Sequence, residues 1–266
     1  MNIALIGYGK MGRLLDVKAR ERGHRITAII DPCATGGESL SGAAVFRDLR
    51  EPGALDQTDL AIEFTSPRAT PDNISVLAQR RIPAVTGTTG WYADLDRVTA
   101  MVTEGGSSLV WAANFSLGVN LFYRIAAYAA QIADPFPEYD VGGWEAHHNK
   151  KADSPSGTAK TLVERVLSQM TRKKRALWDS PEGPPAPDLL HYPSLRIGSA
   201  PGIHTLIFDS PADTVTLTHE ARNREGFAAG ALRAAEWLVD GGPGAEPRRG
   251  VFTMDDVLDG ILVTRG

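Results

Sequence analysis

Cysteine is almost absent from this 266-residue chain, in which Cys33 is the only one. A single thiol can form neither a disulfide framework within the chain nor a thiolate metal cluster, so the sequence excludes both, and we expect no bound metal. A protein without disulfides suits a reducing compartment, and the cytoplasm is its expected location.

An excess of positive charge is lacking too. The chain has 28 lysines and arginines against 32 aspartates and glutamates, which is not the basic footprint of a nucleic-acid-binding protein. No apolar run approaches the length of a membrane-spanning helix, and Met1 leads into an apolar stretch without the basic region of a secretory signal. We therefore expect a globular protein of one large or two modest domains, with neither nucleic acid nor membrane as a partner.

In the first half of the chain, short apolar runs alternate with segments of helical periodicity. The runs predict strands at residues 2–6, 25–30, 59–64, 83–86 and 108–112. The periodic segments between them predict helices at residues 11–22, 69–80 and 92–103. Alternating strands and helices favour a parallel sheet with right-handed crossovers, so the expected fold is α/β with an N-terminal Rossmann-like, doubly wound domain.

The second half has a different pattern. A long helix is expected at 117–133, with Leu121, Ile125, Tyr128 and Ile132 on one apolar stripe. The other expected elements are a strand at 139–144, a helix at 157–170, strands at 204–208 and 214–219, and helices at 226–239 and 255–262. Two strands joined by a short turn favour an open mixed sheet in a smaller α+β domain.

Two stretches between these elements are typical of surface segments. The basic run at residues 172–175 is expected to be a solvated helix end, and the proline-rich stretch at 181–193 to be a loop. Neither stretch predicts a binding site.

The strand at 2–6 leads into Gly7-Tyr8-Gly9-Lys10-Met11-Gly12, a G-x-G-x-x-G pattern placed between a strand and a helix. In a dinucleotide-binding loop the first glycine permits a tight turn, the second lets the backbone approach a pyrophosphate, and the third lets the helix pack closely. The free amides and dipole of the helix N-terminus then hold the phosphates. A lone pattern of this kind is weak, but its position in the first strand–helix unit predicts a nicotinamide dinucleotide site.

An acidic residue, Asp31, ends the second expected strand, where a carboxylate accepts hydrogen bonds from the adenosine ribose. The same carboxylate repels a 2′-phosphate, so NADH is the preferred cofactor. NADPH stays open as the alternative because Lys10 or Arg13 can neutralise a phosphate.

Three further loops follow strands and should meet at the carboxyl edge of the sheet, where such folds bind ligands. They are Phe64-Thr65-Ser66-Pro67, Gly87-Thr88-Thr89-Gly90 and Ala112-Ala113-Asn114-Phe115-Ser116. Taken singly, each is an ordinary turn. Together they predict a cleft in which Asn114 bonds a carboxamide and Phe115 packs on the nicotinamide ring.

The most polar stretch, residues 145–159, contains two adjacent histidines, two adjacent lysines and a Ser-Gly-Thr turn. His147 titrates near neutrality and suits proton donation, and Lys151 supplies positive charge. Gly157 and Thr158 begin an expected helix, where backbone N–H groups attract anions. The stretch therefore predicts a site for a small anionic substrate. Its carboxylates, Glu145 and Asp153, are expected to orient neighbouring groups rather than to react.

Residues 145–159 resemble the signature of the 4-hydroxy-tetrahydrodipicolinate reductase (dihydrodipicolinate reductase) family. The glycine loop, the three strand-end loops and the pair His204-Thr205 follow in matching order, so the resemblance covers essentially the whole chain. It implies NAD(P)H-dependent reduction of a small cyclic dicarboxylate, 4-hydroxy-tetrahydrodipicolinate, to tetrahydrodipicolinate in the diaminopimelate route to lysine, with hydride transfer to carbon 4.

The resemblance also implies residue roles. His147 would be the proton donor and Lys151 a second catalytic or orienting residue, while His148, Gly157 and Thr158 would bind substrate. The cofactor would contact Gly7, Tyr8, Gly9, Lys10, Met11, Gly12, Asp31, Gly87, Thr88, Thr89, Ala112, Ala113, Asn114 and Phe115. A homotetramer is expected, with residues 1–116 as the dinucleotide-binding domain, residues 225–266 returning to it, and residues 117–224 as the substrate-binding and oligomerisation domain.

The chain departs from the family pattern in the glycine loop, which is one residue shorter, and at Ile203, where the family usually has glutamate. Two other functions are compatible with a dinucleotide-binding half. One is an amino-acid dehydrogenase acting through an imine, similar to aspartate dehydrogenase, which would not require His147. The other is a non-catalytic dinucleotide sensor, which would be expected to lose the proton donor or Lys151.

Overall fold

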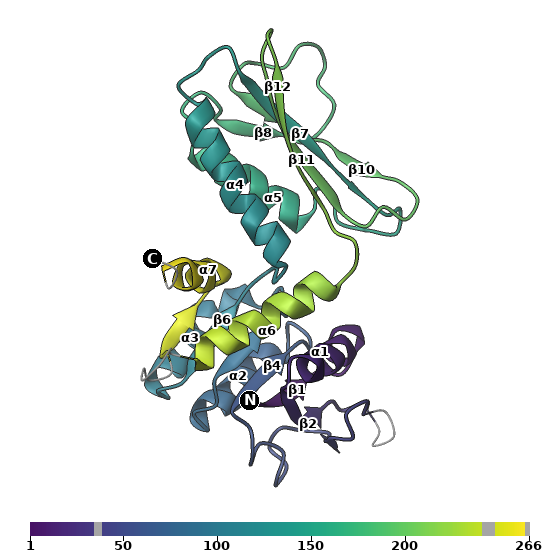
Figure 1. The fold of residues 1–266 in the computed structure, drawn as a ribbon, viewed down its shortest axis with the longest axis vertical. Coiled ribbons are helices and arrows are strands. Elements are labelled where there is room, and N and C mark those ends of the chain that lie inside the picture. Colours follow the sequence, from purple (N-terminus) through teal and green to yellow (C-terminus); the bar gives the residue numbers. More distant parts are fainter. Residues whose placement is uncertain (35–38, 241–247, 264–266) are drawn as a thin grey trace. The chain divides into compact units, whose positions relative to one another are not determined.

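The computed structural model describes residues 1–34, 39–240 and 248–263, and the chain divides into two compact units (Figure 1). Unit 1 consists of Met1–Ser116 together with Phe227–Gly266, and unit 2 is Leu117–Gly226. None of the helices in the described ranges combines the length and apolarity needed to span a bilayer.

Unit 1 is built on a seven-stranded sheet in the order β13-β6-β5-β4-β1-β2-β3, in which all neighbouring strands are parallel. The strands are β1 (Asn2–Ile6), β2 (Arg25–Ile30), β3 (Ala44–Phe46), β4 (Leu60–Glu63), β5 (Ala84–Thr86), β6 (Ser108–Trp111) and β13 (Gly250–Phe252). The flanking helices are α1 (Lys10–Glu21), α2 (Thr70–Gln79), the 3₁₀ helix η2 (Tyr92–Asp94), α3 (Leu95–Glu104), α6 (Glu225–Val239) and α7 (Met254–Val263). The prediction of a Rossmann-like domain is confirmed.

The central strands of this sheet are apolar on both faces, as expected when helices cover both. Ile3, Leu5 and Ile62 are each at most 1% exposed, and such continuous apolar runs are typical of parallel strands. The strand order reverses between β1 and β4, so the loops that follow these two strands diverge at the carboxyl edge. That divergence is where open α/β sheets bind ligands.

Two strands of unit 1 were not expected from the sequence. β3 and β13 are three-residue strands at the two edges of the sheet, and their side chains are only partly buried. A short edge strand lacks the continuous apolar run that identifies a central strand. β13 pairs with β6, so the C-terminal segment completes this sheet.

Unit 2 contains a four-stranded sheet in the order β10-β7-β11-β12, with β10 parallel to β7 and the other pairs antiparallel. The strands are β7 (Asp140–His147), β10 (Ser194–Arg196), β11 (Ile203–Asp209) and β12 (Thr214–Glu220). Helices α4 (Leu117–Ala133) and α5 (Gly157–Ser168) lie side by side against one face of the sheet (Figure 1). The predicted open mixed sheet is confirmed.

The prediction that residues 181–193 form a loop is wrong at one end of that stretch. β9 (Leu189–His191) pairs in parallel with β8 (Arg175–Leu177), and Leu190 is fully buried. The prolines in this stretch favour a loop, and β9 is a short strand that is defined only by its pairing with β8.

Helix α4 has the predicted bounds, but its predicted apolar stripe does not face the core of unit 2. Leu121, Ile125, Tyr128 and Ile132 are 48–65% exposed. The buried face carries other residues: Val119, Asn120, Phe122, Tyr123, Ala126 and Ala130. Because α4 is apolar nearly all round, periodicity identifies the helix without showing which face is covered.

The basic run at 172–175 is not uniformly solvated, so that expectation is also wrong. Lys173 is 3% exposed, its Nζ lies 2.5 Å from Asp140 Oδ1 and donates to the carbonyl of Leu189 at 2.7 Å. Arg172 donates to the carbonyls of Ala133 and Tyr139. These two residues tie together segments of unit 2.

Replacing Lys173 with methionine tests this role. Lys173→Met keeps an unbranched side chain but leaves the Leu189 carbonyl without its donor, so the free energy of unfolding should fall by about 1–2 kcal/mol. Chemical denaturation measures the change. The exposed neighbour Lys174 offers a matched control, since Lys174→Met should change stability by less than about 0.5 kcal/mol. Equal effects of the two substitutions would contradict the assigned role.

Candidate functional site

The glycine loop joins β1 to α1 in unit 1. Gly7 has a φ of +91°, and a Cβ there would overlap the carbonyl of Phe64, while a Cβ on Gly12 would overlap the carbonyl of Gly7. Gly9 is exposed and no atom lies within 4 Å of the place its Cβ would take. The first turn of α1 carries no acidic residue. The loop therefore leaves open space at the start of α1, where no acidic side chain competes with an anion for the helix amides. A pyrophosphate site requires both features.

Asp31 follows β2 beside the glycine loop. Its Oδ2 accepts a hydrogen bond from the Tyr8 amide at 2.7 Å, and its Oδ1 accepts one from the Cys33 amide at 2.8 Å. These bonds hold the carboxylate in place, and each oxygen retains a second lone pair that a ribose hydroxyl can use.

Tyr8 contributes its backbone to this loop, since its side chain is 3% exposed. The phenol donates to Asp16 at 2.5 Å and accepts from the Leu40 amide at 3.0 Å. Burial, followed by the bond to Asp16, raises the pKa of Tyr8. The Arg13 guanidinium lies over the ring, 4.9 Å from its centroid. The side chain of Tyr8 therefore stabilises the glycine loop through its buried contacts with Asp16 and Leu40.

Glu63, a residue that sequence reasoning missed, lies fully buried at the end of β4. Its carboxylate accepts hydrogen bonds from Thr70 and Thr88, both at 3.0 Å, and from Thr65 and Thr86. One carboxylate thus fixes the loops that follow β4 and β5. The sequence pattern that could have indicated this role of Glu63 is a glutamate at the end of one buried strand and a threonine, Thr86, at the end of the next.

The loop after β6 closes the edge of unit 1. Asn114 Oδ1 accepts from the Ser116 amide at 2.8 Å, which ends the loop just before α4. Phe115 is 2% exposed, and its ring lies 6.2 Å from that of Phe64. The ring of Phe115 thus packs beside that of Phe64, and its packing on a nicotinamide stays a prediction. Ala113, by contrast, is exposed.

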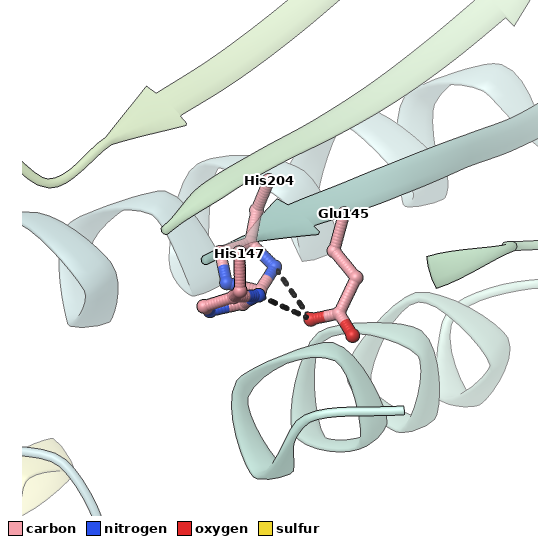
Figure 2. Close-up of side chains that lie close together, drawn as sticks. All are labelled: Glu145, His147 and His204. Carbon is pink, nitrogen blue, oxygen red and sulfur yellow. Dashed lines mark ion pairs between the residues drawn. The ribbon is translucent and has the colours of Figure 1, made fainter. Parts of the chain in front are cut away.

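In unit 2, strand register brings a second set of groups together. Glu145 and His147 are two residues apart on β7, so they share one face of the sheet. His204 on β11 is the register partner of Glu145, and Arg196 on β10 is the partner of His147. Figure 2 shows both imidazoles directed at one carboxylate oxygen of Glu145.

Glu145 is fully buried at the centre of this cluster. Its Oε1 accepts hydrogen bonds from the Ser156 amide at 2.9 Å and the Ser194 hydroxyl at 2.7 Å, and lies 3.3 Å from Arg196 Nη2. Its Oε2 accepts from the Ser156 hydroxyl and lies 3.3 Å from His147 Nδ1. Burial alone would raise the pKa of Glu145, but the bonds from Ser156 and Ser194 outweigh it and hold that pKa below its usual value.

The two histidines lie edge to face, with ring centroids 5.2 Å apart. Burial lowers the pKa of His147, Glu145 opposes that shift, and Lys151 and Arg196 add to it. Burial lowers the pKa of His204 to about 4. At neutral pH His204 is therefore uncharged.

The start of α5 borders the cluster. Ser156 caps the helix by accepting from the Ala159 amide at 3.1 Å, and the first turn contains no acidic residue. Gly157 is exposed, with nothing within 4 Å of the place its Cβ would take. Thr158 follows it in the first turn, so the positive end of the helix dipole and open space coincide.

The remaining residues predicted for this site lie in the loop between β7 and α5. Lys151 Nζ lies 2.7 Å from Asp153 Oδ1, and this bond lowers the pKa of Asp153. His148 is exposed. Arg196, which sequence reasoning missed, donates to the Asp153 carbonyl at 2.5 Å and so attaches this loop to β10. A protonatable imidazole, two cations and a helix N-terminus therefore gather in this part of unit 2.

Glu145, His147 and His204 are also residue types that bind metals, and one ligand atom from each lies within 4.8 Å of the others. The carboxylate is already engaged by two serines, and its Oε1 faces the Arg196 guanidinium. A cation bound there would lie close to that positive charge, which disfavours it. The donor set therefore fits a carboxylate held by serines and an arginine beside two imidazoles better than a metal centre.

Comparisons with known proteins identify the family of this chain. Residues 1–115 match the family described as dihydrodipicolinate reductase, N-terminus, and residues 118–258 match dihydrodipicolinate reductase, C-terminus. The chain is 36% identical over 263 residues to a 4-hydroxy-tetrahydrodipicolinate reductase of Christiangramia forsetii, which covers 98% of this chain and 99% of the relative. It is 34% identical over 270 residues to the protein of that name from Chromobacterium violaceum, covering 97% and 98% of the two chains.

A solved structure shares the fold. A dipicolinate-bound dihydrodipicolinate reductase from Paenisporosarcina sp. TG-14 aligns with a TM-score of 0.75 over 95% of this chain and 97% of that chain. The two sequences are 22% identical, so this likeness concerns the fold alone.

Acid should destabilise the cluster through His204. Its pKa lies near 4 in the folded chain and at 6.5 ordinarily, so between these values the unfolded chain binds more protons. His204 alone should therefore lower the free energy of unfolding by about 3 kcal/mol at most as the pH falls from about 6.5 to about 4. Denaturation at a series of pH values measures this. The slope should flatten in His204→Phe and persist in the control His148→Gln; an unchanged slope in His204→Phe would refute the assignment.

Proposed function

The chain belongs to the dihydrodipicolinate reductase family, and on that premise we propose that it reduces 4-hydroxy-tetrahydrodipicolinate to tetrahydrodipicolinate, a step in the diaminopimelate route to lysine. It is an NAD(P)H-dependent oxidoreductase. The observation that carries the assignment of the site is the cluster around Glu145, in which a proton donor, His147, adjoins the cations and helix N-terminus that a dicarboxylate needs.

The reaction fits groups of this kind. Loss of the 4-hydroxyl group as water leaves a conjugated cyclic imine, hydride from the nicotinamide adds at carbon 4, and the electron pair moves so that the neighbouring carbon takes a proton. His147 supplies that proton from its imidazolium form, since histidine is the side chain suited to acid catalysis near neutral pH. Lys151 is the second catalytic residue, which orients the substrate and offsets its negative charge.

The substrate carries two carboxylates, which require fixed donors. The amides of Gly157 and Thr158 at the start of α5 bind one of them, supported by the helix dipole. The exposed ring of His148 and the ammonium group of Lys151 serve the other. A glycine at position 157 suits this role because it leaves the approach to the backbone open.

Residues 1–116 with 225–266 form the dinucleotide-binding domain under this proposal, and NADH is the better cofactor. The loops that hold it run from Gly7 to Gly12, from Gly87 to Thr89 and from Ala112 to Phe115. Asp31 binds the adenosine ribose, and its fixed carboxylate would repel the 2′-phosphate of NADPH. Lys10 is exposed at the start of α1 and permits some use of NADPH.

Residues 117–224 hold the substrate and form the subunit contacts of a homotetramer. The support for an oligomer is the apolar stripe of α4, with Leu121, Ile125, Tyr128 and Ile132 each about half exposed. Contiguous apolar surface of this kind marks a site of association.

A coupled assay tests the activity. The substrate is generated from pyruvate and aspartate semialdehyde, and oxidation of NADH and of NADPH is followed by absorbance. His147→Gln should lower kcat by about 10²-fold or more, because acid catalysis is lost, with little change in NADH affinity. Lys151→Ala should lower kcat, raise the KM for substrate, or both. No cofactor oxidation with the unsubstituted protein would refute the proposal, and oxidation of free aspartate with NAD⁺ would favour the amino-acid dehydrogenase.

Asp31 offers a separate test of cofactor choice. Asp31→Ala removes the ribose contact and the repulsion of a 2′-phosphate, so kcat/KM should fall for NADH and rise relatively for NADPH. Steady-state kinetics with both cofactors measure the ratio. An unchanged ratio would show that Asp31 does not contact the ribose.

A further inference from the structure

His147, the proposed proton donor, has one ring nitrogen, Nδ1, for which no hydrogen-bond partner has been identified in the described part of the chain. His147 Nδ1 is buried and makes no hydrogen bond within the described residues. The nearest carboxylate oxygen is Glu145 Oε2, 3.3 Å away. Buried polar atoms in folded proteins are nearly always paired, so this contact must serve the nitrogen when it bears a proton.

We propose that Glu145 is the positioning residue of this site: its carboxylate holds His147 by Nδ1, so that Nε2 presents the proton to the substrate, and binds the N-terminus of α5 at the same time. The inference rests on the proposed function, in which His147 is the donor. Glu145 itself contacts neither substrate nor cofactor in this role.

The carboxylate is held firmly enough to do this. Ser156 approaches both of its oxygens, Ser194 and Arg196 approach Oε1, and Glu145 is fully buried. Because the side chain is fixed from β10 and α5 as well as from its own strand, it cannot turn away from His147. An imidazole paired in this manner keeps one ring orientation and one neutral tautomer.

The opposite side of the His147 ring is kept open by a glycine. Gly202 has a φ of +115°, and a Cβ there would lie 3.3 Å from His147 Nε2. With Nδ1–H directed at Glu145, the imidazolium donates from Nε2 and becomes the neutral Nδ1–H tautomer. No other protein group has to rearrange during this transfer.

Glu145 also connects the two parts of the site. The Ser156 amide and hydroxyl that bind the carboxylate belong to the N-cap residue of α5, whose first amides are proposed to bind a substrate carboxylate. The position of the proton donor is thereby fixed relative to the anion-binding end of the helix. A dicarboxylate held by α5 meets His147 in a constant geometry.

The remaining charged and titratable groups agree with this assignment. Lys151 and Arg196 act on His147 as cations, Asp153 as an anion, and Glu145 is the negative group directly against the ring. His204 approaches the same Oε2 at 3.9 Å, but its burial keeps it neutral, and His219 lies beyond it. The carboxylate charge acts on both His147 and His204, but at His204 burial outweighs it, so His147 is the histidine that Glu145 can hold as an imidazolium.

NMR of the imidazole nitrogens tests the proposal without any turnover. In the unsubstituted protein, neutral His147 should be the Nδ1–H tautomer. In Glu145→Gln the pKa of His147 should fall, because the anion that stabilises the imidazolium is removed. Glu145→Asp, which keeps the charge, should restore a large part of that difference. A neutral His147 protonated at Nε2 in the unsubstituted protein would overturn the proposal, even if no variant folds.

Kinetics provide the second readout. Because an acid must be protonated to act, the alkaline limb of the kcat–pH profile should move to lower pH in Glu145→Gln, with kcat reduced roughly 10- to 100-fold and NADH affinity unchanged. The exposed carboxylate of Glu138 offers a charge-matched control, and Glu138→Gln should leave the profile unmoved. A lower kcat without a shifted limb would show a merely structural role and would also overturn the proposal.

The two readouts separate this inference from the function on which it rests. If the tautomer and pKa behave as expected but no reductase activity is found, the proposed function fails and the positioning role stands. If the reductase activity is present and the pKa of His147 is indifferent to Glu145, the positioning role fails and the function stands.

Discussion

The site of unit 2 depends on one buried carboxylate. Removing the charge of Glu145 from water costs several kcal/mol, and this cost is offset only if the oxygens are bonded well. Ser156 bonds them from the start of α5, and Ser194 and Arg196 approach them from β10. The local structure of α5, β10 and β7 is consequently coupled through Glu145, and His147, the proposed proton donor, lies 3.3 Å from the same carboxylate.

In unit 1 a second buried carboxylate is also stabilised by hydrogen bonds, but from different donors. Glu63 is as fully buried as Glu145, but its partners are the hydroxyls of Thr65, Thr70, Thr86 and Thr88 rather than a cation. These neutral donors satisfy the carboxylate while fixing the loops at the carboxyl edge of the sheet. In each unit a buried anion thus organises the backbone around the place where a ligand is proposed to bind.

The parts of the fold that sequence reasoning predicted are those with a local cause. The central strands of unit 1 are continuous apolar runs, and the glycine loop is a steric requirement expressed within six neighbouring residues. The edge strands β3 and β13 were missed because pairing with a remote neighbour defines them. The burial of Lys173 was predicted wrongly, and the covered face of α4 was not predicted, for a related reason: burial depends on what packs against a side chain.

The candidate site also has a part that local sequence predicts and a part that depends on the tertiary structure. By itself, the sequence determined the chemistry of the chain, because residues 145–159 and the glycine loop carry their functional groups within short, contiguous segments. Only the tertiary structure decided which groups meet His147 and Glu145. Ser194 and Arg196 reach Glu145 from 49 and 51 positions along the chain, and His204 reaches it across a strand pair. The hydrogen-bond register between β7, β10 and β11 sets these contacts, and register is a long-range property that no local pattern expresses.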